Sequence, residues 1–360
     1  MRRFLLALLS LLAATPAMAA PLDCPLRDAP FSSRSPLIDL LLSPRAAAIL
    51  RQRVPDLGRG LPADFLRTEA PSFAAILTVR DVVKGPDASV QLERLDRALA
   101  AVPVTAEDRR QRCARYDDDR PAFKLSAGRP RFLLFEKING FRDSPSVDAA
   151  HAAFVTIARR HGWALASTDR GGAINAATLR SFDAVIWNNI SGDVLTLSQR
   201  AALRRFVERG GGFVAVHGSA GDPATFWDWY SDRLIGARFL GHPMSPQFQA
   251  ATIRLEDRSG PVTSGLPPSW SMTDEWYSFR ANPRASGAHV LATLDERSYR
   301  LVGMNGEDLR MGDHPIAWTR MLGRGRVFYS AIGHRPEQYA EPLYLRMLDQ
   351  AMRWTARARR

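Results

Sequence analysis

Lysine is scarce in this sequence of 360 residues, because it occurs only at Lys84, Lys124 and Lys137. The net charge of +12 is therefore carried almost entirely by arginine. The basic residues are scattered along the chain and form no basic block interleaved with aromatic side chains, which is the pattern typical of nucleic-acid-binding proteins. We therefore expect no nucleic-acid partner.

Long hydrophobic runs are missing beyond the first residues. Arg2 and Arg3 precede an apolar run from Phe4 to Ala14, and Ala17-Met18-Ala19 places small residues where signal peptidase reads them. This run is too short to span a membrane. The pattern predicts a signal peptide over residues 1–19, no membrane span, and a periplasmic or secreted protein; a buried N-terminal helix is the alternative interpretation.

Only two cysteines are present, Cys24 and Cys113. In an oxidising compartment such a pair favours a disulfide, which would close the N-terminal segment on itself. Two free thiols are the alternative. Neither cysteine lies in a pattern typical of a catalytic nucleophile.

Two regions follow the predicted signal peptide. Residues 20–128 predict a small helical region, with helical apolar spacing over 36–50 and 87–101 and a polar linker over 114–130. Residues 129–360 predict an α/β domain, in which short apolar runs alternate with amphipathic segments. The expected strands cover 131–136, 163–167, 183–188, 213–217, 250–255, 289–294, 316–319 and 326–331, and the expected helices cover 146–161, 197–209 and 342–355. This alternation predicts a doubly wound, mostly parallel sheet.

The loops after the expected strands are the predicted binding edge, since open α/β sheets bind ligands beyond the carboxyl ends of their strands. Residues 139–143, 188–193, 217–222 and 333–335 are all rich in glycine and polar side chains. His217 occupies the sharp turn where related folds place a nucleophile. Because neither serine nor cysteine stands there, acyl-enzyme chemistry of the glutaminase or hydrolase type is disfavoured.

Histidines and carboxylates gather near these loops, although no HxH or HExxH pair reveals a metal site by its spacing. Imidazole and carboxylate groups suit a zinc-type site and equally suit general acid/base catalysis near neutral pH. For His314, a purely structural role is as well supported as a role in a pocket. The aromatic residues near the same loops suit the faces of sugars, and core packing would use them as well.

Several short motifs together resemble the ThuA-like (trehalose utilisation) family. They are Gly140-Phe141-Arg142, residues 189–195, residues 210–217, Trp229-Tyr230, Gly241-His242-Pro243, residues 274–280, residues 313–318 and Gly333-His334. The resemblance spans roughly residues 131–356. It implies a flavodoxin/glutamine amidotransferase-like fold and an enzyme of sugar metabolism, acting on a disaccharide or a 3-keto-glycoside. Family members often follow Gly-Phe-Arg with histidine, where this chain has Asp143.

These observations lead to a periplasmic carbohydrate-active hydrolase, lyase or isomerase as the main hypothesis. The expected catalytic residues are His217, Glu275 and His334, with Glu275 or His217 as the base and with Arg142 and loop amides stabilising an oxyanion. The expected residues binding a saccharide or keto-saccharide are Phe141, Arg142, Asp143, Asn189, Asp193, Trp229, Tyr230, Trp276 and His314. If a divalent metal such as zinc is bound, its expected ligands are His217, His242 and His334. A non-catalytic sugar-binding or interaction protein is the alternative, and the sequence does not predict the oligomeric state.

Overall fold

A nine-stranded sheet forms the centre of the computed structural model, which describes residues 21–356. The predicted signal peptide, residues 1–19, lies outside this range. In sheet order the strands are β2 (Ala164–Thr168), β1 (Arg131–Phe135), β3 (Ala184–Asn188), β4 (Gly212–Val216), β11 (Gly325–Ser330), β10 (Pro315–Leu322), β9 (His289–Leu294), β6 (Phe248–Leu255) and β7 (Ser269–Glu275). The first five of these pair in parallel. The predicted doubly wound, mostly parallel α/β class is confirmed.

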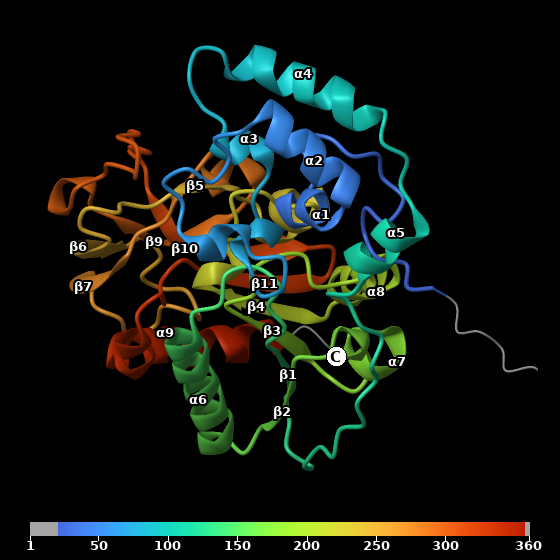
Figure 1. The fold of residues 1–360 in the computed structure, drawn as a ribbon. Coiled ribbons are helices and arrows are strands. Elements are labelled where there is room, and N and C mark those ends of the chain that lie inside the picture. Colours follow the sequence, from blue (N-terminus) through green and yellow to red (C-terminus); the bar gives the residue numbers. More distant parts are fainter. Residues whose placement is uncertain (1–20, 357–360) are drawn as a thin grey trace, which may run out of the picture.

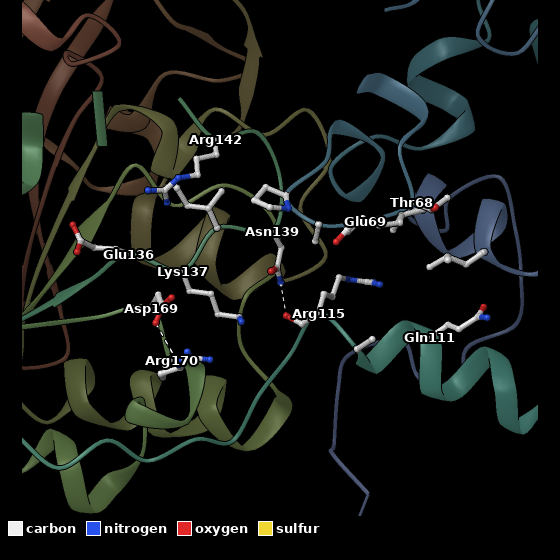
Figure 2. Close-up of a pocket in the computed structure, with 16 residues that line it drawn as sticks. Thr68, Glu69, Gln111, Arg115, Glu136, Lys137, Asn139, Arg142, Asp169 and Arg170 are labelled. Atoms are coloured by element: carbon white, nitrogen blue, oxygen red, sulfur yellow. Dashed lines mark hydrogen bonds and ion pairs between the residues drawn. The ribbon is translucent and has the colours of Figure 1, made fainter. Parts of the chain in front are cut away.

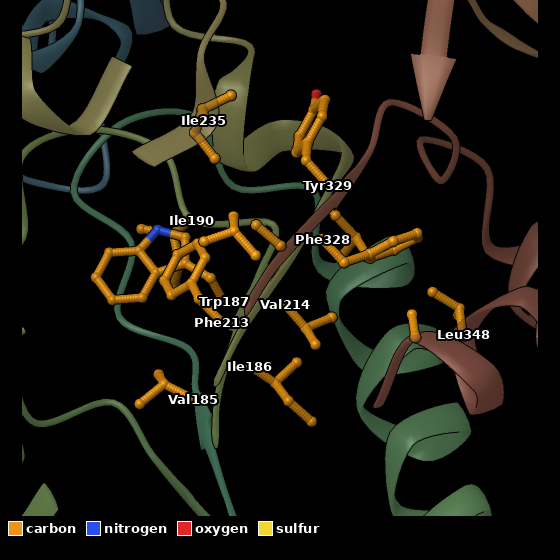
Figure 3. Packing of buried hydrophobic residues seen from close by; sticks show 14 of the residues in the cluster. Val185, Ile186, Trp187, Ile190, Phe213, Val214, Ile235, Phe328, Tyr329 and Leu348 are labelled. Atoms are coloured by element: carbon orange, nitrogen blue, oxygen red, sulfur yellow. The ribbon is translucent and has the colours of Figure 1, made fainter. Parts of the chain in front are cut away.

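The core lies on both faces of the parallel strands. Every residue of β3 and β4 is buried, which explains why these strands are continuous apolar runs. Successive side chains of a strand point to opposite faces, so Ile186 and Trp187 of β3 enter different halves of the core. Figure 3 shows Ile186, Val214 and Phe328 on the face near Leu348, with Trp187 on the other face.

The helices of the α/β domain cover these two faces (Figure 1). They are α6 (Ser144–Arg160), α7 (Ala176–Leu179), α8 (Leu197–Glu208) and α9 (Pro342–Thr355). The connection from β1 to β2 and that from β3 to β4 run outward in opposite directions along the sheet. Because such crossovers are right-handed, they place α6 and α8 on opposite faces. The change of direction lies between β1 and β3, so a ligand is expected at the carboxyl ends of these strands.

The other strands extend the sheet in antiparallel pairs. β10 lies antiparallel between β11 and β9, and β6 lies antiparallel between β9 and β7. β9 and β7 therefore run in the same direction as the parallel strands. The carboxyl end of β7, and with it Glu275, therefore belongs to the same edge as the binding loops. The sequence did not predict β7, nor the short pair β5 (Phe239–Gly241) and β8 (Ser278–Phe279).

The N-terminal region has a small core of its own. Its helices are α1 (Leu37–Leu42), α2 (Pro44–Arg53), α3 (Val79–Val82), α4 (Ala88–Ala100) and α5 (Ala106–Cys113). The predicted disulfide between Cys24 and Cys113 is confirmed. Residues 114–130 contain no helix or strand. Within residues 21–356, no helix combines the length and apolar character that crossing a bilayer requires.

Backbone hydrogen bonds fasten the N-terminal region to the binding edge of the α/β domain. The N–H of Ser72 donates to the carbonyl of Asn139 at 3.0 Å, and the N–H of Ala224 donates to the carbonyl of Ile76 at 3.3 Å. An ion pair from Lys137 to Asp117, at 2.8 Å, adds a contact with the linker. The segment around residues 72–76 is therefore held directly beside the loops that follow the strands.

Candidate functional site

A cavity of about 350 Å³ lies at the carboxyl edge of the sheet. The loops after β1, β3, β4 and β11 and the end of β7 supply its walls. Phe141, Asp143, Asn189, His217 and His334 all line it. The parallel topology thus brings the four predicted loops together around one cavity.

His217 stands at the turn directly after β4. Its φ of +34° is a left-handed conformation that residues other than glycine rarely adopt. Its side chain is buried, and its Nδ1 lies 2.8 Å from the carbonyl oxygen of Ala331. Because a carbonyl oxygen only accepts, Nδ1 carries the proton. Nε2 faces Glu275 and His334, at 3.4 and 3.2 Å. In the neutral ring Nε2 carries a lone pair, and in the protonated ring it donates to Glu275.

His334 lies between two carboxylates. Its Nδ1 is 2.9 Å from Oε2 of Glu275, and its Nε2 is 3.5 Å from Oδ2 of Asp143. Burial alone would lower the pKa of His334, but the hydrogen bond to Glu275 and the charges of Glu275 and Asp143 raise it overall. Asp143 also accepts a hydrogen bond from Oγ of Ser146 at 2.5 Å. Asp143 therefore serves as a second carboxylate partner of His334.

Glu275, the last residue of β7, is the centre of this cluster, with 1% of its surface exposed. Its Oε1 accepts a hydrogen bond from Nε2 of Gln247 at 2.5 Å and lies 3.2 Å from Nδ1 of His242. Burial opposes the charge of Glu275, but hydrogen bonds from the protonated rings of His217 and His334 outweigh burial and hold its pKa well below the usual range. Glu275 is therefore a fixed anion, and it is a poor acceptor for a substrate proton.

Three atoms of this cluster form a compact triangle: Nε2 of His217, Oε2 of Glu275 and Nδ1 of His334. Its sides are 3.4, 2.9 and 3.2 Å. Ligand atoms about 2.0–2.1 Å from a tetrahedral zinc ion are about 3.4 Å apart, so the triangle is close to one face of such a site. Among residues 21–356, these three residues are also the group whose donor atoms are close enough to hold a metal ion. The ligand set expected from the sequence changes in one member, because His242 contacts Glu275 from the far side of the carboxylate.

Asp222 lines the same cavity and was not predicted as a site residue. Burial raises its pKa to about 7, although hydrogen bonds from Oγ of Ser191 (2.5 Å) and the N–H of Gly192 (2.6 Å) oppose this rise. Asp222 ends the loop 217–222, so its place after β4 was the signal in the sequence that could have identified it.

Three of the predicted substrate-binding residues lie away from the lining of this cavity, in the packing between α8 and residues 227–230. Asp193 is in an ion pair with Arg200, at 2.9 Å. The hydroxyl of Tyr230 donates to the carbonyl of Ser219, and the ring of Trp229 stacks on Trp227 at 5.1 Å. These side chains support the loop after β4 on the side away from the cavity.

Trp276 and His314 are also structural in their placement, and both are fully buried. Nε1 of Trp276 donates to the carbonyl of Gln249 at 2.8 Å. Nε2 of His314 donates to the carbonyl of Tyr277 at 2.9 Å, and its Nδ1 lies 2.8 Å from Glu296. Of the two roles left open for His314, the structure supports the structural one, because its hydrogen bonds position Tyr277, whose ring stacks on His217 at 4.2 Å.

Arg142 faces a second cavity, of about 590 Å³, between the N-terminal region and the ends of β1 and β2. Figure 2 shows its lining, where charged side chains of both signs alternate. Nε of Arg142 donates to Oγ of Ser144 at 3.2 Å. The expected oxyanion role of Arg142 is therefore not supported by its position, because Arg142 does not line the cavity of Glu275.

The N-terminal region contributes walls that the sequence did not predict. Phe65, Phe73 and Ile76 line the cavity of Glu275. They lie more than sixty residues before Phe141, and no periodic pattern connects them to the binding loops. Only the fold of the whole chain places them there.

One family model matches most of the α/β domain. The family described as ThuA (trehalose utilisation) matches residues 131–355. A ThuA-like protein of known structure from Bacteroides uniformis is 25% identical with a TM-score of 0.55, and the match covers 66% of this chain and 95% of that one. A ThuA-like protein from Parabacteroides merdae is 17% identical with a TM-score of 0.49, and the match covers 63% of this chain and 90% of that one. PurLQS from Thermotoga maritima is 11% identical with a TM-score of 0.37, and the match covers 62% of this chain and 98% of that one.

A comparison with curated proteins finds no match. The ThuA match spans more than half of the chain and includes every residue of the triangle, while Phe65 and Phe73 lie before its start. At the level of the family, the function is related to trehalose utilisation. This chain belongs to the ThuA trehalose-utilisation family.

Proposed function

We propose that this chain is an exported carbohydrate-active enzyme that acts on a disaccharide or a 3-keto-glycoside. The single observation that carries the proposal is the buried triangle of His217, Glu275 and His334 on the wall of a cavity large enough for a small molecule. A buried carboxylate surrounded by imidazoles is costly to assemble unless the charges are used or compensated. Perturbed pKa values in a cavity are typical of functional sites.

His217 is the better of the two expected bases. Its proton on Nδ1 is held by Ala331, so Nε2 is free to take a proton from water or from the carbon beside a sugar carbonyl. Glu275 instead stabilises the positive charge that His217 would gain. His334, whose pKa is raised, can donate a proton to a sugar oxygen from its Nε2, while Glu275 holds the ring through Nδ1.

The same three side chains also fit a divalent cation such as zinc. The donor set of two imidazoles and one carboxylate is one that catalytic zinc sites use, and Ala331 and Asp143 would orient the two imidazoles through their other ring nitrogens. A bound ion would polarise a sugar carbonyl or acidify a water molecule. Elemental analysis of the purified protein and of Glu275→Gln decides between the roles: near-stoichiometric metal, lost in the variant, makes Nε2 of His217 a ligand rather than a base.

Export rests on the expected signal peptide and is supported by the disulfide of Cys24 and Cys113, since disulfides persist in oxidising compartments. Sequencing the N-terminus of the protein recovered from the periplasm tests this part. A mature chain that begins at residue 20 is expected. Retention of the first 19 residues in a cytoplasmic protein would contradict export.

The enzymatic proposal is tested by incubating the purified protein with trehalose and with 3-keto-glycosides and following substrate loss by chromatography. We expect consumption by the wild type and by His289→Ala, whose imidazole is exposed and far from the cavity lining. We expect His217→Ala to be slower by about 10²-fold or more. Saccharide binding without consumption by any of these proteins would contradict catalysis.

A further inference from the structure

The cavity has two chemically different halves. Its polar half contains Glu275, His217 and His334, which would face the hydroxyl or carbonyl groups of a sugar ring. Its other half is apolar and includes Phe65, Phe73, Ile76 and Phe141. A second sugar ring could place its C–H face on this half, but its hydroxyl groups would lose water there without gaining hydrogen-bond partners, so a fully apolar group fits this half better.

Three phenyl rings form a stack that leads to the triangle. The centroids of Phe65 and Phe73 are 4.2 Å apart with an angle of 9° between the ring planes. Phe73 and Phe141 follow at 4.8 Å, and Phe141 lies 6.3 Å from the ring of His334 at an angle of 29°. Phe65 and Phe141 therefore cover the two faces of Phe73, and the stack presents ring edges to the cavity. A flat aromatic group packs its face against such edges in an edge-to-face arrangement.

This apolar wall is held in place and is accessible. The hydrogen bonds from Ser72 to Asn139 and from Ala224 to Ile76 bracket Phe73 on both sides in the sequence. Phe141 is 39% exposed, and Met304, which also lines the cavity, is 63% exposed. Large apolar side chains in contact with water at the mouth of a cavity mark a surface that binds an apolar group.

We propose that the site takes a glycoside whose aglycone is a flat aromatic group. The sugar would lie at the triangle and the aglycone against the Phe65–Phe73–Phe141 wall. Two of these three rings belong to the N-terminal region, which lies before residue 131, where the ThuA match begins. The N-terminal region therefore determines which aglycone is accepted. This inference rests on the proposed function for the identity of the glycone.

The test compares phenyl α-glucoside, methyl α-glucoside and trehalose as ligands, with affinities measured by calorimetry. We expect the phenyl glucoside to bind wild-type protein about tenfold more tightly than the other two, which is the size of effect expected for one edge-to-face aromatic pair. In Phe73→Ala we expect the affinity for the phenyl glucoside to fall about tenfold and the affinity for the methyl glucoside to fall less than twofold. Val90→Ala, which removes an exposed apolar side chain from α4, is the matched control and should leave all three affinities unchanged.

Three outcomes would overturn the inference: equal affinities of wild-type protein for the three ligands, no binding of the phenyl glucoside, or an equal loss for phenyl and methyl glucosides in Phe73→Ala. If Phe73→Ala fails to fold, Phe65→Ala provides the same comparison. Aryl-selective binding without turnover would support the apolar subsite and contradict the proposed enzyme. Turnover of trehalose and aryl glucoside with equal KM would support the enzyme and contradict the subsite.

Discussion

Asp222 should make the stability of this protein depend on pH. Its pKa is raised from 3.8 to about 7 in the folded chain. Between these two values the folded state holds a proton that the unfolded state has released, so the free energy of unfolding must fall as the pH rises. The contribution of Asp222 is fully present below pH 3.8 and is lost above about pH 7. At about 1.36 kcal/mol for each pH unit, the whole difference is about 4 kcal/mol.

Asp222→Asn removes this titration, while the amide oxygen can still accept a hydrogen bond from Ser191 or Gly192. Urea denaturation of both proteins, followed by tryptophan fluorescence between pH 4 and pH 8, measures the effect. As the pH rises across this range, we expect the free energy of unfolding to fall by about 4 kcal/mol more in the wild type than in the variant. Other titrating groups are present in both proteins and largely cancel. A constant difference between the two curves at every pH would refute the raised pKa of Asp222.

Three further perturbations test other parts of the structure. Glu275→Gln removes the anion that raises the pKa of His334, so this pKa should fall towards its ordinary 6.5 in an NMR titration; an unchanged value would contradict the contact. Asp39→Asn leaves a buried Arg115 guanidinium without its anion, with a cost of about 3–5 kcal/mol in urea denaturation. Replacing both cysteines of the disulfide with serine reopens a loop of sequence separation 89, which should cost about 4 kcal/mol by thermal or urea unfolding; an unchanged midpoint would contradict either of these two expectations.

The parallel half of the fold could be predicted because its strands are unbroken apolar runs. β3 and β4 are buried on both faces, and their sequences show it directly. Once the strands are known, the right-handed crossovers and the common direction of the strands bring His217, Asn189 and His334 to one edge. The binding loops could thus be grouped without any knowledge of distances.

The position of Glu275 could not be derived in this way. It ends β7, an edge strand whose burial alternates imperfectly and whose sequence, Ser269 to Glu275, is mostly polar. Its contact with His217 depends on the segment after β11, where the N–H groups of Gly333 and Arg335 donate to Asp274 at 2.6 and 3.1 Å. Such a contact between distant segments has no local signal, which is why His242 was expected in the place of Glu275 among the metal ligands.

Several polar and aromatic residues were indistinguishable from site residues in the sequence. Asp193, Trp276 and His314 lie beside residues that do line the cavity, and each has found a buried partner of its own. A buried polar group with a hydrogen-bond partner has the same sequence signature as a binding group. Only the three-dimensional contacts separate the two.

The central claim is that His217 and His334 act as one unit with Glu275. It is tested most directly by kcat/KM for His217→Ala, for His334→Ala and for the double variant, measured on a substrate that the wild type consumes. If the residues form one centre, each single variant should lose about 10²-fold or more, and the double variant should be no slower than the slower single variant. Losses that multiply in the double variant, or a single variant with wild-type activity, would contradict the account.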